Sequence, residues 1–229
     1  MSSTIADRLA AVRQRVAAAA DSSGRDPSDI TLIAVGKTFP AELVAEAVRA
    51  GATDLGENRV QEGVAKRPEV PPATWHLIGP LQRNKARAAL EVFDIIHTVD
   101  RPEIARRLQF LLEEHWPDRR QKVLMEVNVG CEPQKAGVEP DEAHELLAEI
   151  IGCDRLSVIG LMAIPPFGSE PEDTRPHFRA LRELRDRLQD RCGLVLPELS
   201  MGMSHDFEVA ISEGATMVRV GTAIFGQRG

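Results

Sequence analysis

Short apolar stretches alternate with longer amphipathic stretches along the chain. The apolar stretches are rich in β-branched residues and are bounded by Gly, Pro or Asp, which is typical of buried parallel strands. The longer stretches carry Ala, Leu, Glu and Arg at helical spacing. This pattern predicts strands at residues 30–36, 52–56, 74–79, 95–99, 122–129, 156–163, 198–203 and 215–220. It predicts helices at residues 4–20, 40–50, 57–67, 82–91, 101–115, 140–152, 173–191 and 205–213.

Eight strands that alternate with eight helices predict an α/β fold, a (β/α)8 TIM-like barrel. A helix precedes the first strand, and only residues 221–229 follow the last. We therefore expect the additional N-terminal helix to cover part of the gap left by a short or missing final helix. The alternative is an open doubly wound sheet, which normally has fewer strands. The proline-rich stretches are short enough to be loops, so residues 1–229 are expected to form one domain.

Composition and charge exclude several classes of protein. Hydrophobic residues make up 43% of the 229 residues, which excludes a wholly disordered chain. The net charge of −7 disfavours a nucleic-acid partner. No apolar run is long enough to span a membrane, and no signal-peptide pattern is present. The three cysteines are widely spaced, which indicates neither a disulfide framework nor a metal site, and a cytoplasmic location fits.

The end of the first predicted strand carries the first candidate for chemistry. Barrel active sites lie at the C-terminal ends of the strands. Lys37 directly follows the buried stretch that ends at Gly36. A lysine in a partly dry barrel mouth has a lowered pKa and can form a Schiff base with an aldehyde. The alternative is that Lys37 extends to solvent.

The last two strands carry candidate anion-binding groups. Arg219 lies within an apolar strand, so it must pair or face a polar site. Gly221 lets the backbone approach a ligand, and Thr222 adds a hydroxyl. Ser204 ends the seventh strand. Together these residues indicate a phosphate site beside the strand that carries Lys37, although Ser204 could be a helix N-cap and Gly221 a simple turn residue.

The alternation within the strands places further polar groups in the barrel lumen. In the fifth strand Leu124, Glu126 and Asn128 are expected to face inward, and in the seventh strand Ser200 does so. The third strand carries His76. For His76 and Asn128 two interpretations stay open. Each side chain either contacts a ligand or is a hydrogen-bonded group of the core.

Several stretches together resemble the pyridoxal phosphate homeostasis protein family. They are residues 33–37 (IAVGK), 56–62 (GENRVQE), 75–85 (WHLIGPLQRNK), 199–204 (LSMGMS) and 218–226 (VRVGTAIFG). Members bind pyridoxal 5′-phosphate (PLP) on a barrel like the N-terminal domain of alanine racemase. The resemblance runs from the first strand to the C-terminus, and it implies PLP as the cofactor.

The resemblance also implies roles for individual residues. Lys37 would carry PLP as a Schiff base, and Arg219 would face the pyridine nitrogen. Ser204, Gly221 and Thr222 would hold the phosphate, and Asn58 would lie by the ring. His76, from its place in the third strand, is a further predicted cofactor contact. The implied function is a carrier or regulator in vitamin B6 homeostasis. Its partners would be PLP, amino acids and transient PLP-requiring client enzymes.

The residues themselves argue against catalytic turnover, so we predict no catalytic residue. An arginine at the pyridine nitrogen cannot act as an acid, which weakens the electron sink that PLP enzymes use. Alanine racemase-like enzymes take a tyrosine from a partner's extra domain, and this chain has no tyrosine. The alternatives are a PLP-dependent racemase or lyase of low activity and, without PLP, a barrel enzyme for a phosphorylated sugar. Because no dimerising domain is apparent, we expect a monomer.

Overall fold

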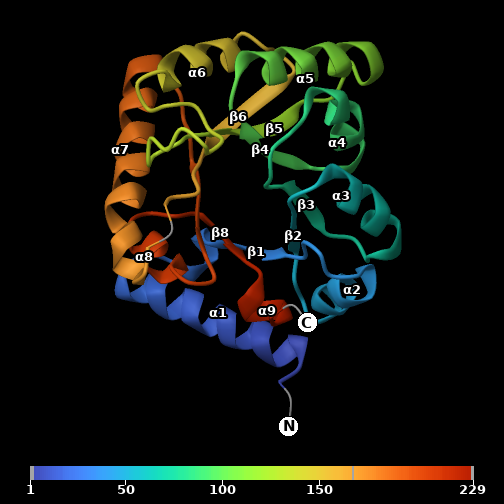
Figure 1. The fold of residues 1–229 in the computed structure, drawn as a ribbon, viewed down its shortest axis with the longest axis vertical. Coiled ribbons are helices and arrows are strands. Elements are labelled where there is room, and N and C mark those ends of the chain that lie inside the picture. Colours follow the sequence, from blue (N-terminus) through green and yellow to red (C-terminus); the bar gives the residue numbers. More distant parts are fainter. Residues whose placement is uncertain (1–2, 167, 228–229) are drawn as a thin grey trace.

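Eight parallel strands close into a barrel in the computed structural model, which describes residues 3–166 and 168–227 (Figure 1). Each strand pairs with its neighbours in sequence, and β8 closes the barrel on β1, with Arg219 opposite Ile33. The predicted barrel is confirmed. The strands are β1 (Thr31–Val35), β2 (Asp54–Glu57), β3 (Thr74–Leu77), β4 (Ile95–Val99), β5 (Gln121–Glu126), β6 (Leu156–Met162), β7 (Glu198–Met203) and β8 (Met217–Val220).

Helices surround the barrel on the outside (Figure 1). They are α1 (Ile5–Ser22), α2 (Ala41–Arg49), α3 (Val60–Lys66), α4 (Ala86–Val92), α5 (Pro102–His115), α6 (Ala143–Ile151), α7 (Arg175–Cys192), α8 (Phe207–Ser212) and α9 (Thr222–Phe225). Short 3-10 helices lie between them, namely η1 (Pro27–Asp29), η2 (Arg67–Glu69), η3 (Arg83–Lys85) and η4 (Pro171–Thr174).

The N-terminal helix occupies the place that a full final helix would fill. A capping box between Thr4 and Asp7 starts α1. Along its length α1 packs against α8, α9 and α2. The Arg8 Nε–H donates to the carbonyl of Ile224, at 2.6 Å, which joins α1 to the one-turn α9. The expectation that this helix covers the gap is confirmed.

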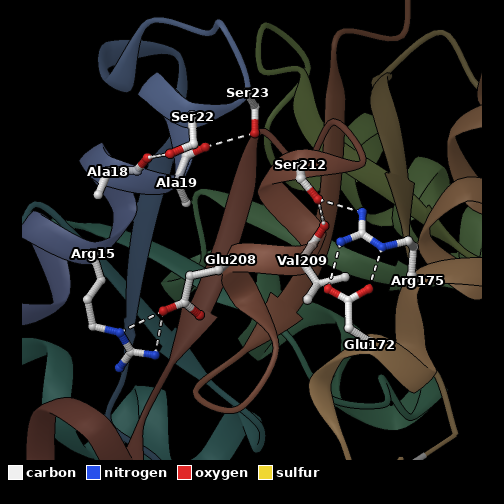
Figure 2. Close-up of a pocket in the computed structure, with 10 residues that line it drawn as sticks. All are labelled: Arg15, Ala18, Ala19, Ser22, Ser23, Glu172, Arg175, Glu208, Val209 and Ser212. Atoms are coloured by element: carbon white, nitrogen blue, oxygen red, sulfur yellow. Dashed lines mark hydrogen bonds and ion pairs between the residues drawn. The ribbon is translucent and has the colours of Figure 1, made fainter.

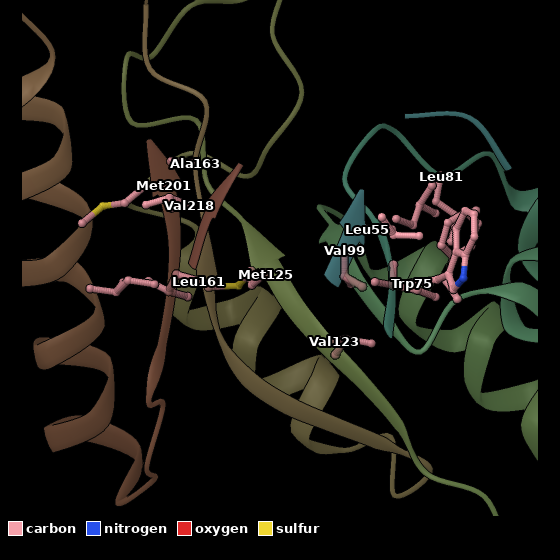
Figure 3. Close-up of a cluster of buried hydrophobic side chains, with 14 of the residues drawn as sticks. Leu55, Trp75, Leu81, Val99, Val123, Met125, Leu161, Ala163, Met201 and Val218 are labelled. Atoms are coloured by element: carbon pink, nitrogen blue, oxygen red, sulfur yellow. The ribbon is translucent and has the colours of Figure 1, made fainter. Parts of the chain in front are cut away.

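The two faces of each strand build two separate hydrophobic clusters. Outward-facing residues such as Val123 and Met125 of β5 pack against the helices, and in Figure 3 the side chains of Leu161 and Met201 point toward a neighbouring helix. Inward-facing residues form a smaller apolar cluster in the lumen, which consists of Ile33, Ile95, Leu124, Met162 and Met217 with Ile159 beside them. The alternation predicted for the fifth strand is therefore confirmed at Leu124.

Most predicted elements differ from the structure by one to three residues at their ends, and two of the differences have a clear local description. The fifth strand ends at Glu126 rather than at residue 129, because the Asn128 amide folds the chain into a loop. Its Nδ2 donates to the carbonyl of Glu132, and its Oδ1 accepts from the Glu132 N–H. The helix predicted at 82–91 starts as the 3-10 turn η3 and becomes α-helical only at Ala86.

Candidate functional site

Lys37 lies in the turn that follows β1, and its side chain is half-buried. The next residue, Thr38, has a φ of 68°, an uncommon conformation for a residue with a side chain. Hydrogen bonds hold the backbone on both sides of Lys37. The Thr38 N–H donates to Glu62 Oε2 at 2.8 Å, and the Gly36 carbonyl accepts from Lys66 Nζ at 2.9 Å. The turn is therefore fixed where the amine leaves the strand.

Behind this turn lies a buried group of three charged residues, the Lys66 cluster, formed by Glu57, Glu62 and Lys66. Lys66 Nζ lies 2.7 Å from Glu57 Oε1 and 3.3 Å from Glu62 Oε2, and its side chain is 9% exposed. Burial raises the pKa of Glu57 to about 7, although Lys66 opposes the shift. Sequence reasoning missed this cluster, yet the spacing of Glu62 and Lys66 is that of a helical ion pair.

The residues predicted to hold a phosphate meet at the ends of β7 and β8. The Gly221 N–H donates to Ser204 Oγ at 3.2 Å. The N-cap of α8 is Asp206, so Ser204 is not a helix N-cap. A Cβ atom on Gly221 would lie 3.3 Å from the Val35 carbonyl oxygen, which places Gly221 against the end of β1. Thr222 follows as the exposed first residue of α9.

Arg219 is buried in the barrel lumen at 3% exposure. Among the residues that the structure describes, two acceptors take its N–H groups: Ser200 Oγ at 2.6 Å and the Ala163 carbonyl at 2.9 Å. Burial lowers the pKa of Arg219 to about 10, while Glu126 and Asp206 act in the opposite direction. The guanidinium therefore keeps its proton at neutral pH.

Asn58 and His76 occupy different positions in the barrel. Asn58 follows β2 and is half-buried, and its backbone fits against Gly79, where a Cβ would lie 2.3 Å from the Asn58 carbonyl oxygen. His76 has no exposed surface. Its Nε2 lies 2.9 Å from Asp54 Oδ1, and its Nδ1 lies 2.9 Å from His97 Nε2. His76 is thus a hydrogen-bonded group in the lumen, and its predicted contact with a cofactor remains a prediction.

Glu126 is the second lumen residue that the alternation predicted. It ends β5 at 4% exposure, and its Oε2 has no hydrogen-bond partner among the described residues. Burial raises the pKa of Glu126 to about 7, and the nearby Asp100 carboxylate adds to the shift while Arg219 opposes it. A carboxyl with such a pKa holds a proton in the lumen below neutral pH.

Cavities flank the barrel mouth and also occur elsewhere. One of about 610 Å³ adjoins the predicted site, and it is lined by Asn58, Arg59, Val60, Gln61, Glu62, Pro80, Gln82 and Lys85. Another of about 460 Å³ lies in the helical layer around α1 and α8 (Figure 2). It is lined partly by the ion pairs Arg15–Glu208 and Arg175–Glu172, and it contains none of the predicted site residues.

Neither a metal-binding cluster nor a membrane-spanning helix is present within residues 3–166 and 168–227. No group of His, Cys, Asp and Glu residues in these ranges could hold a metal ion. No helix in them is long and apolar enough to cross a membrane.

Comparison with known proteins gives closely similar relatives over nearly the full length. A family model described as "Alanine racemase, N-terminal domain" matches residues 8–229. The Aquifex aeolicus protein named "Pyridoxal phosphate homeostasis protein" is 45% identical over 224 residues, which are 97% of each chain. A Pseudomonas aeruginosa protein of the same name is 44% identical over 228 residues, 99% of this chain and 96% of that one.

Solved structures of similar proteins share the barrel. PipY of Synechococcus elongatus, solved without PLP and with PLP bound, is 40% identical, with TM-scores of 0.86 and 0.85. Each match covers 97% of this chain and 100% of PipY. Alanine racemase of Clostridium difficile is 17% identical, with a TM-score of 0.76 over 97% of this chain and 57% of that one, a likeness of fold alone.

We predict that Glu126→Gln stabilises the ligand-free protein in a pH-dependent way. The unfolded chain ionises this carboxyl near 4.5, whereas the folded protein keeps it protonated up to about 7. The free energy of unfolding of the wild type therefore falls as the pH rises from 4.5 to about 7. A glutamine does not ionise, so the variant avoids this loss. The variant should match the wild type near pH 4.5 and exceed its free energy of unfolding by up to about 3 kcal/mol at pH 8.

Urea unfolding at several pH values measures this difference. Glu183→Gln, at an exposed position of α7, is the control and should show no such trend. A constant difference between Glu126→Gln and the wild type from pH 4.5 to pH 8 would contradict the raised pKa.

Proposed function

The chain belongs to the pyridoxal phosphate homeostasis protein family, built on the barrel of the alanine racemase N-terminal domain, and we propose that it binds PLP and acts in vitamin B6 homeostasis. One observation carries the proposal. An amine, a set of hydroxyl and backbone donors, and a guanidinium lie on the adjoining strands β1, β7 and β8 of one barrel. The structure of PipY with PLP bound supports the same ligand for this chain.

The chemistry of these residues fits PLP. Ser204 and Thr222 offer hydroxyls to a phosphate, and the ordered Gly221 backbone lets the phosphate come close because glycine has no side chain. Lys37 offers an amine that can bind an aldehyde carbon covalently. When bound, PLP would supply this aldehyde. It would also supply an aromatic ring that withdraws electrons from a group attached at the aldehyde carbon.

Lys37 is proposed as the covalent attachment point, and the Lys66 cluster holds its turn. Both backbone groups beside Lys37 are bonded to members of that cluster, so the amine leaves β1 in a fixed direction. Asn58 is proposed to lie beside the ring, at the edge of the neighbouring cavity. His76 pairs with Asp54 and His97 in the lumen, and its contact with PLP stays a prediction.

We further propose that the protein holds PLP without significant catalytic turnover. Arg219 is proposed to face the pyridine nitrogen, where its guanidinium donates a hydrogen bond and keeps its proton because its pKa is about 10. The sequence contains no tyrosine to act on the opposite face of a substrate. A complete acid–base pair for a racemase or lyase is therefore not expected.

The setting of this activity is part of the same proposal. We expect residues 1–229 to work as one domain and as a monomer in the cytoplasm. The exchange partners would be amino acids and transient PLP-requiring enzymes. Cys131, Cys153 and Cys192 are free thiols in the structure, which fits a reducing compartment.

We predict that Lys37→Ala abolishes covalent PLP attachment while the fold survives, because the half-buried side chain fills no core volume. The loaded wild type should be yellow, lose its colour with borohydride, and yield a PLP adduct on the Lys37 peptide by mass spectrometry. A matched control is Lys85→Ala, which alters the neighbouring cavity and should leave the adduct in place. A PLP adduct on Lys85 or Lys135 would refute Lys37 as the attachment point. A colourless protein would favour an enzyme for a phosphorylated sugar.

We predict that the wild type binds pyridoxal, which lacks the phosphate, at least about tenfold more weakly than PLP. Each hydrogen bond to a charged group contributes about 1.5–3 kcal/mol, and pyridoxal would lose several. Gly221→Val should weaken PLP binding in the same titration, because a side chain there blocks the backbone. Gly152→Val, at the open end of α6, serves as the control, and equal affinity of the wild type for the two ligands would refute the phosphate site.

We predict that α-proton exchange of amino acids in deuterated water stays near the rate found with free PLP. An arginine at the pyridine nitrogen leaves the electron sink weak for loss of the α-proton. Racemisation would also need an acid–base group on the far face of the substrate, worth about 10²–10⁴-fold, and the sequence has no tyrosine to supply it. The measurement is NMR of the loaded protein with a panel of amino acids. Turnover near 1 s⁻¹ or faster, in the ordinary range of enzymes, would instead favour the racemase or lyase alternative.

A further inference from the structure

Five polar side chains from five strands form a continuous hydrogen-bond path through the barrel lumen, here named the lumen chain: Asp54, His76, His97, Ser200 and Arg219. Asp54 Oδ1 lies 2.9 Å from His76 Nε2. His76 Nδ1 lies 2.9 Å from His97 Nε2, and His97 Nδ1 lies 2.9 Å from Ser200 Oγ. The Arg219 guanidinium completes the path with a donor 2.6 Å from the same Oγ.

The lumen chain is dry except at one end. His76, His97 and Ser200 have no exposed surface, and Arg219 is 3% exposed. Only Asp54, the first residue of β2, reaches solvent, with 18% of its side chain exposed. Because water does not reach the inner members, each must satisfy its hydrogen bonds within the path.

The chemistry of the two ends fixes the direction of every hydrogen bond. A guanidinium only donates, so Ser200 Oγ accepts from Arg219. Among the described residues the other partner of this Oγ is His97 Nδ1, so the Ser200 O–H donates there. His97 must then carry its proton on Nε2 and donate to His76 Nδ1. His76 in turn carries its proton on Nε2 and donates to the Asp54 carboxylate, which only accepts. Both histidines are therefore neutral Nε2–H tautomers, and the two ends demand the same direction.

The surroundings of His97 agree with a neutral ring. Burial holds the pKa of His97 well below its usual value, and the charge of Arg219 acts in the same direction. Glu126 and Asp206 are the acidic groups whose charges act on Arg219, and neither is a member of the lumen chain.

We propose that Asp54, His76, His97 and Ser200 are positioning residues for Arg219, which they hold in one orientation through a one-directional hydrogen-bond chain that starts at the Asp54 carboxylate. The Ala163 carbonyl fixes the second guanidinium nitrogen, so the rotation of the group is set at two points. This inference rests on the proposed function in one respect, that Arg219 faces the pyridine nitrogen. The state of the lumen chain itself does not depend on PLP.

The first experiment uses the ligand-free wild-type protein. Two-bond nitrogen–proton NMR spectra distinguish histidine tautomers, and with six histidines in the sequence, single His→Gln variants assign the signals. At pH 7.5 we expect His76 and His97 to be neutral with the proton on Nε2. A proton on Nδ1, or a doubly protonated ring, at either histidine would overturn the inference.

The second experiment changes the remote end of the lumen chain. In Asp54→Asn the new amide can donate to His76 as well as accept from it, so only the Arg219 end still favours one direction. We expect His76 to populate both tautomers and the Arg219 guanidinium N–H groups to exchange with solvent at least tenfold faster. The control is Asp94→Asn, because Asp94 accepts from the Trp75 N–H but does not touch the lumen chain.

The third experiment measures how changes in the lumen chain affect the PLP dissociation constant. Asp54→Asn should raise the PLP dissociation constant about threefold and Ser200→Ala about tenfold, with the Lys37 adduct still formed and with Asp94→Asn at the wild-type value. Unchanged Arg219 exchange and PLP affinity in a folded Asp54→Asn would overturn the positioning role. If the wild type binds no PLP, the proposed function fails, and the tautomers and Arg219 exchange still decide the inference. If Asp54→Asn does not fold, Ser200→Ala and the wild-type tautomers decide it.

Discussion

The interior of a closed barrel excludes water, and Arg219 places a permanent positive charge inside it. Each N–H of a buried guanidinium needs an acceptor, because an unpaired buried charge costs several kcal/mol. Ser200 and the Ala163 carbonyl supply two such acceptors, and Ser200 pairs in turn with His97, which pairs with His76. The path ends only where Asp54 reaches water. As a consequence, one polar path crosses a lumen that is otherwise packed with apolar residues such as Ile33 and Leu124.

A related constraint shapes the end of β1. The Lys37 amine is useful only if the turn that carries it is rigid, and Thr38 beside it adopts a positive φ that few side chains tolerate. The Lys66 cluster offsets this cost by binding the backbone on both sides of Lys37. The buried ion pair between Lys66 and Glu57 therefore has a geometric role, which is to fix the direction of the amine.

These two arrangements favour holding a cofactor over reacting on it. A guanidinium fixed at two points donates hydrogen bonds and does not release a proton at neutral pH. The groups proposed to bind phosphate, the lysine proposed for attachment and the guanidinium come from the adjoining strands β1, β7 and β8, whose positions the closed barrel fixes. The family shares this barrel, and the proposed role of this chain follows from which polar groups face its mouth.

The sequence by itself determined the barrel, because strand and helix periodicities are local properties of the chain. It also predicted that Ser204 and Gly221 meet, since residues that follow neighbouring parallel strands lie at one edge, and the structure joins them by a hydrogen bond. The roles of Lys37 and Arg219 stay predictions. The sequence left His76 open between two interpretations and missed the Lys66 cluster. Those outcomes depend on which side chains from distant strands lie within 3 Å of each other, as His97 and Ser200 do across 103 positions. Only the tertiary structure decides such contacts, because strand register and barrel closure, rather than local pattern, set the distances.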